Sequence, residues 1–168
     1  DLVYKVALIT GKDSAAQSDF FKIVKENNAG IVIDSYPVQV QGKYSEAEIL
    51  SALEYVDQKG GYDCVALVRG GGSLEDLITF NSERIARMIF AMSIPVIVGV
   101  GHEKDESIAD FVADIRASTP SQAAYYIVVN NEKFIKTQEM KIDVIAKALR
   151  DELTAKRMDI EGKAANIS

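Results

Sequence analysis

The first hundred residues alternate between short apolar runs and longer segments with helical spacing of apolar side chains. Four short runs predict strands: residues 5–10, 31–37, 64–68 and 95–100. The first of them is apolar on both faces, as in a buried parallel strand. The segments between them have the spacing of amphipathic helices: residues 14–27, 45–59 and 83–92. This alternation predicts an α/β fold, with an open, mainly parallel sheet and helices on both faces.

Such a three-layer arrangement is Rossmann-like or flavodoxin-like. Sequence signals for helix starts agree with it. Ser45 and Glu48 have the spacing of a capping box at a helix start. Residues 107–115 are expected to hold a further short helix. The ends of the strands, where loops begin, are then the places to look for a binding site.

The last third of the chain has the pattern of one long amphipathic helix. Pro120 stands at a favourable first helical position, and no glycine or proline follows until Gly162. Apolar residues recur there at spacings of three and four: Ile142, Ile145, Leu149 and Leu153. We therefore expect an α/β domain at residues 1–122. Residues 123–168 would begin a helical, coiled-coil-like region whose apolar stripe needs a partner.

Composition excludes several classes of protein. A single cysteine among 168 residues excludes a disulfide framework and a multi-cysteine zinc site. The apolar runs are far shorter than the roughly 20 residues of a membrane span, and no signal peptide is visible, so we expect no membrane association and a cytoplasmic location. The net charge is −6, whereas nucleic-acid-binding proteins usually carry an excess of basic residues on one face. Action on a polyanion would therefore need a local site or a partner.

The most informative loop follows the third apolar run and reads Arg69-Gly70-Gly71-Gly72-Ser73. Consecutive glycines let the backbone approach a ligand, and their N–H groups can form a concavity for an anion. Arg69 adds a planar guanidinium that matches two phosphate oxygens. The sequence thus favours a phosphate site here over a flexible surface loop with an exposed arginine.

The next loop carries His102, the only histidine in the chain, with Asp105 three residues later. Histidine suits proton transfer near neutral pH, and a nearby carboxylate can orient it. A zinc site is disfavoured because no second histidine follows the His-Glu pair. Asp105, Asp110 and Asp114 are candidate ligands for magnesium, whereas an exposed helix face is the alternative for the last two. The metal question stays open at this point.

Tyrosines are a weaker signal. Tyr36, Tyr44 and Tyr62 have rings on which bases could stack, but scattered tyrosines are more often packing and rim residues. Cys64 lies inside an apolar run and is expected to be a small core residue.

Several of these segments together resemble the large subunit of exodeoxyribonuclease VII. The resemblance runs in register from about residue 4 to 124, and five motifs carry it: residues 36–42, 69–77, 80–83, 101–105 and 108–121. It implies the catalytic domain of a nuclease that hydrolyses single-stranded DNA from its ends to short oligonucleotides. It also implies that several copies of a small subunit bind the helical region.

The resemblance further implies four catalytic residues, carried over position by position: Asp19, Arg69, His102 and Asp105. Phosphate binding would fall to Gly70, Gly71, Gly72 and Ser73. A cofactor is not implied with certainty, and magnesium is the candidate. Two other functions remain open: a phosphate- or nucleotide-binding module without catalysis, and a degenerate assembly scaffold.

Overall fold

The structure is a computed structural model that describes residues 2–27, 30–71, 74–101 and 106–165. It contains one sheet of five parallel strands in the order β2-β1-β3-β4-β5. The strands are β1 (Lys5–Thr10), β2 (Val32–Pro37), β3 (Cys64–Val68), β4 (Val96–Gly99) and β5 (Ile115–Arg116). The helices are α1 (Ala15–Glu26), α2 (Ser45–Lys59), the 3-10 helix η1 (Leu74–Asn81), α3 (Glu83–Ala91), α4 (Ile108–Val112) and α5 (Pro120–Ala165).

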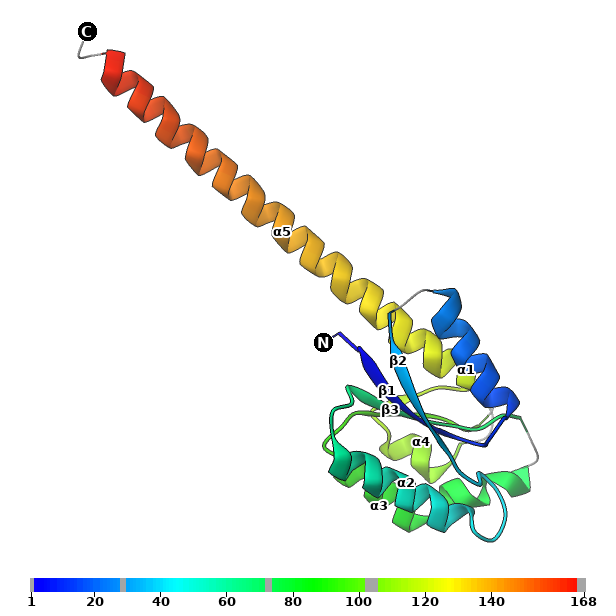
Figure 1. Ribbon diagram of the computed structural model, residues 1–168. Coiled ribbons are helices and arrows are strands. Elements are labelled where there is room, and N and C mark those ends of the chain that lie inside the picture. The colour runs from blue at the N-terminus through cyan, green and yellow to red at the C-terminus, as the bar shows by residue number, and fades with distance from the viewer. Residues whose placement is uncertain (1, 28–29, 72–73, 102–105, 166–168) are drawn as a thin grey trace. The chain divides into compact units, whose positions relative to one another are not determined.

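Helices lie on both faces of the sheet, which explains why the central strands β3 and β4 are buried and apolar throughout, whereas the edge strand β2 is only partly buried and contains Asp34 and Ser35. Helices α2, α3 and α4 cover one face, where Ile49, Leu53 and Ile85 pack on alternate strand residues such as Ile9 and Leu67. Helix α1 and the first turns of α5 cover the other face, around Phe20 and Ile127 (Figure 1). The predicted three-layer α/β fold is therefore confirmed.

The chain forms two compact units, residues 1–131 and 132–168. The first turns of α5 belong to the first unit, because Ala123 and Ile127 are buried in its core. In the second unit the apolar residues of α5 are exposed: Ile142, Ile145, Leu149 and Leu153. In the part of the chain that the structure describes, no helix is both long and apolar enough to cross a membrane.

The short helix expected within residues 107–115 is present as α4, which ends at Val112, and Ile115 begins β5. One local expectation is corrected by the structure. Ser45 and Glu48 form no capping box: the Ser45 hydroxyl donates to the Gly42 carbonyl at 2.6 Å. The Glu48 carboxylate accepts the backbone N–H of Gln39 at 2.6 Å. Both side chains thus hold the loop before α2 instead of capping the helix.

Candidate functional site

The strand order identifies one edge of the sheet as the natural binding place. The chain passes from β1 outward to β2 and then returns to the other side of β1 to form β3. In open parallel sheets, ligands bind at the carboxyl ends of the strands where the order reverses in this way. Here those ends are Thr10 of β1 and Arg69, the residue that follows β3. The point between β1 and β3, where the strand order reverses, is the topological switch point. The segment that starts at Arg69 and continues with Gly70, called the arginine-glycine loop below, therefore begins there.

Arg69 is held in place by the neighbouring strand. Its side chain and backbone are only 5% exposed, and its backbone N–H donates to the carbonyl of Gly99 at 3.1 Å. Gly70 follows next to the start of α1, because a Cβ atom built on it would lie 3.7 Å from the Ala16 nitrogen. Arg69 and Gly70 thus lie between the end of β4 and the first turn of α1.

The start of α1 is fixed by Ser14, whose hydroxyl accepts the N–H of Gln17 at 3.1 Å. Asp19 is exposed on this helix. It lies three residues after Ala16, and residues at this spacing are neighbours on a helix surface. The structure therefore places Asp19 one turn away from the residue that approaches Gly70.

The other predicted site residues lie outside the described residues: Gly72, Ser73, His102 and Asp105. The chain positions on either side of the His102 segment are described. Gly101 follows β4, and Glu106 forms an ion pair with Arg116 of β5. Gly101 therefore lies at the same edge of the sheet as Arg69, because both residues follow the carboxyl end of a strand.

Two of the candidate magnesium ligands have structural partners. Asp110 forms a capping box with Ser107 at the start of α4, and its Oδ2 accepts the Ser107 hydroxyl at 2.7 Å. The Asp114 carboxylate accepts the N–H of Val96 at 2.8 Å. Within the described ranges, no three histidine, cysteine or acidic side chains cluster as a metal site would require. Asp105 lies beyond those ranges.

Two buried polar atoms have no hydrogen-bond partner among the described residues: the Thr10 hydroxyl and Oδ1 of Asp110. A buried polar atom without a partner costs roughly 1–3 kcal/mol. The sequence singled out Asp110 as a candidate magnesium ligand, whereas nothing marked Thr10, because a threonine at a strand end is ordinary.

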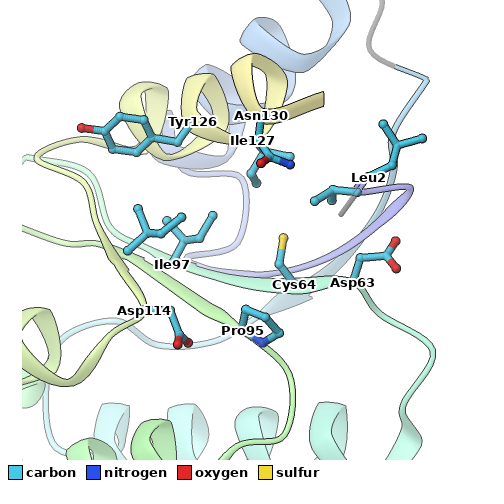
Figure 2. Close-up of a pocket in the computed structure, with 11 residues that line it drawn as sticks. Leu2, Asp63, Cys64, Pro95, Ile97, Asp114, Tyr126, Ile127 and Asn130 are labelled. Carbon is cyan, nitrogen blue, oxygen red and sulfur yellow. The ribbon is translucent and has the colours of Figure 1, made fainter. Parts of the chain in front are cut away.

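A cavity of about 360 Å³ lies at the opposite, amino-terminal edge of the sheet. Figure 2 shows Cys64 in its floor, with Tyr126 and Ile127 of α5 across from it. Burial raises the pKa of Cys64 to about 12, so its thiol is neutral and unreactive at ordinary pH. This confirms the expectation of a core cysteine.

A polar network joins β2, α2 and the start of β3. The Lys59 ammonium donates to Tyr36 at 3.0 Å and to Tyr62 at 2.9 Å, and the Tyr62 hydroxyl donates to Asp34 at 2.8 Å. That last hydrogen bond and the ammonium of Lys5 hold the pKa of Asp34 below its usual range. Two of the three tyrosines considered for stacking, Tyr36 and Tyr62, therefore have structural partners, whereas Tyr44 is exposed.

Comparison with known proteins connects this arrangement to one family. The sequence matches the family model described as "Exonuclease VII, large subunit" over residues 1–167. It is 43% identical over 136 residues to the protein named "Exodeoxyribonuclease 7 large subunit" of Hamiltonella defensa subsp. Acyrthosiphon pisum (strain 5AT). That match covers 81% of this chain and 30% of the relative, so the chain spans about a third of the relative's length. On these matches, the chain belongs to the exonuclease VII large subunit family.

Proposed function

We infer that this chain contributes the catalytic domain of a nuclease that hydrolyses phosphodiester bonds of single-stranded DNA from its ends. The observation that carries the proposal is the position of Arg69 and Gly70 at the topological switch point. A guanidinium and backbone N–H groups at this place suit a phosphate group. The family membership supplies the nuclease chemistry, and the geometry supports where it takes place.

In this mechanism the scissile phosphate binds at the arginine-glycine loop. The guanidinium of Arg69 pairs with phosphate oxygens, and the N–H groups of Gly70, Gly71 and Gly72, with the Ser73 hydroxyl, stabilise the charge that develops on them. Because Arg69 is almost fully buried, its interaction with an anion is screened by water much less than that of a surface arginine.

Proton transfer is assigned to His102. A water molecule attacks phosphorus, the bond to the leaving oxygen breaks, and one proton moves from the water to the leaving group. His102 takes or delivers that proton. Asp105 orients His102 or, together with Asp19, positions the water or a magnesium ion. This assignment of Asp19 is supported by its place on α1, one turn beyond Ala16, the residue that lies next to Gly70.

The exposed apolar residues of α5 support a role in assembly. Ile142, Leu149 and Leu153 lie on a long helix and are exposed to more than half of their full surface. A helix stripe of this kind is stable in water when a partner covers it. We assign this stripe to several copies of the small subunit of the enzyme.

The test uses the full-length polypeptide copurified with its small subunit. End-labelled single-stranded DNA and a duplex control are incubated in magnesium and in EDTA, with wild-type protein and with His102→Ala. We expect release of label from single strands only, abolished by the substitution. The EDTA reaction determines whether a metal is required. A complex that binds DNA without cleaving it would replace the nuclease with a binding module or a scaffold.

A further inference from the structure

A second groove lies at the same edge of the sheet as Arg69, at the carboxyl end of β2. Its volume is about 380 Å³, within the roughly 300–1,000 Å³ of ligand sites. Its lining comes from the end of β2 and the first turns of α2: Pro37, Val38, Tyr44, Ala47, Glu48 and Ser51. The proposed function gives this groove no role.

Both walls of the groove are held by hydrogen bonds. The segment after β2 is fixed to α2, because the Glu48 carboxylate accepts the Gln39 N–H at 2.6 Å. The turn before α2 is closed by Ser45, which donates to the Gly42 carbonyl through its N–H at 3.2 Å and its hydroxyl at 2.6 Å. Ser45 is 1% exposed. The groove is therefore preformed, which lowers the entropy cost of binding.

This fixed turn presents an aromatic ring and an ammonium group. Tyr44 is 59% exposed, and its side chain forms no cap for α2. The Lys43 ammonium lies 5.6 Å from the centre of the Tyr44 ring. Among the described residues, neither Lys43 nor Lys12 of the adjacent β1–α1 loop forms an ion pair, so both ammonium groups are available to a phosphate, beside the carboxylates of Asp13 and Glu48 at the same edge.

An exposed ring beside an ammonium group is a combination with which proteins hold single strands. Bases stack on aromatic faces without regard to sequence, and lysines neutralise the phosphates between them. Glu48, the acidic residue in the lining, keeps its negative charge but has one carboxylate oxygen held by the backbone N–H of Gln39. The remaining lining is apolar or uncharged, which suits the flat face of a base.

We propose that this groove binds one nucleotide of the single strand, with its base stacked on Tyr44 and its phosphate beside Lys43. The proposal rests on the proposed function and adds a binding subsite to it. β2 is separated from β3 by β1 alone, and adjacent strands are about 4.8 Å apart, so the groove begins roughly 10 Å from Arg69 across the sheet. One strand of DNA can therefore occupy both places within a few nucleotides.

The experiment measures binding of fluorescent oligothymidylate by the full-length complex, beside an abasic strand of equal length. Tyr44→Ala should weaken binding of oligothymidylate about tenfold and leave the abasic strand unaffected, because only the stacked base is lost. Tyr44→Phe keeps the ring and should bind as wild type. Tyr4→Ala is the matched control, since Tyr4 is 64% exposed but precedes β1 at the opposite edge.

Lys43 is tested through salt dependence. Lys43→Gln should lower the slope of log affinity against log salt by about 0.7, the value for one phosphate contact on a single strand. Lys22→Gln on α1 serves as control, because the Lys22 side chain is 68% exposed and its contact with Glu26 is long at 3.9 Å. An unchanged slope for Lys43→Gln would contradict the phosphate contact.

The outcomes separate this proposal from the proposed function. If wild type degrades single strands in an Arg69-dependent way and Tyr44→Ala binds like Tyr4→Ala, the subsite is wrong and the nuclease stands. If Tyr44→Ala weakens the abasic strand equally, or disrupts assembly with the small subunit, the groove contacts backbone or protein and the stacking proposal is overturned. If wild type neither binds nor cleaves single strands, both proposals fail.

Discussion

Gly99, the last residue of β4, lies against Thr119, the residue just before α5. A Cβ atom built on Gly99 would meet the Thr119 carbonyl oxygen at 3.2 Å and Cγ1 of Val68 at 3.3 Å. Both distances are shorter than ordinary van der Waals contact. The absence of a side chain at Gly99 thus allows the start of α5 to pack directly on the sheet, and the same residue accepts the Arg69 N–H.

We expect Gly99→Ala to destabilise the protein by about 1–3 kcal/mol, the usual cost of overpacking a core. The measurement is the urea midpoint by circular dichroism. Gly162→Ala is the control, because nothing lies within 4 Å of a Cβ there and alanine favours a helix by about 0.5–1 kcal/mol. Equal midpoints for Gly99→Ala and wild type would show that Thr119 and Val68 move aside without cost.

Arg69→Lys should lower kcat on single-stranded DNA by about 10²–10³-fold, the typical loss for one donor to a developing anion. Lysine keeps the positive charge but not the planar pair of donors. Initial rates with saturating DNA measure this effect, and circular dichroism checks folding. The control is Arg87→Lys on α3, where the side chain is 78% exposed and pairs with Glu83. An unchanged kcat for Arg69→Lys would show that the Arg69 guanidinium does not bind the scissile phosphate.

Asp34→Asn should lower stability at pH 7 and have a progressively smaller effect in acid. The pKa of Asp34 is depressed in the folded protein, so its stabilisation is complete above the unfolded value near 3.9 and disappears as the pH falls through the folded value. Urea midpoints of both proteins at pH 7 and pH 3 measure the difference. A difference in urea midpoint between the two proteins that is larger at pH 3 than at pH 7 would contradict the stabilising hydrogen bond from Tyr62 to Asp34.

Cys64 should resist iodoacetamide in the folded protein at pH 8 and react readily in urea. Its pKa of about 12 leaves almost no thiolate, and the residue is 4% exposed. Mass spectrometry of the alkylated protein over time gives the rate. Native labelling as fast as that of the unfolded chain would mean that the amino-edge cavity opens freely.

The central strands β1, β3 and β4 could be predicted because they are buried on both faces and nearly all of their residues are apolar. Strand β5 could not, because Ile115 and Arg116 are too few to show a period, and their place depends on Asp114, which binds the N–H of Val96. The 3-10 helix η1 was missed for a related reason: its three-residue repeat differs from the spacing that identifies an α-helix.

The part of the candidate site that could be predicted from the residues alone is the run of glycines after Arg69. The glycines after Arg69 predicted a phosphate-binding loop, and the strand order places the start of that loop, Arg69 and Gly70, at the switch point. Asp19 came from the family resemblance alone, because an acidic residue on a helix face carries no signal of its own. Tyr44 could not be separated from Tyr36 and Tyr62 by sequence, since only three-dimensional packing distinguishes an exposed ring from two that bind Lys59.

The two hydrogen bonds between Val3 and Asn131 have a consequence for how the chain folds during its synthesis. The Val3 N–H donates to Asn131 Oδ1 at 2.8 Å, and Asn131 Nδ2 donates to the Val3 carbonyl at 2.7 Å, across 128 positions of sequence. Nearly the whole α/β unit must therefore have emerged from the ribosome before these two hydrogen bonds can form. Until α5 emerges, the face of the sheet that Ala123 and Ile127 cover remains open to water. A nascent chain paused before Pro120 would carry that apolar face uncovered, the state in which such chains aggregate.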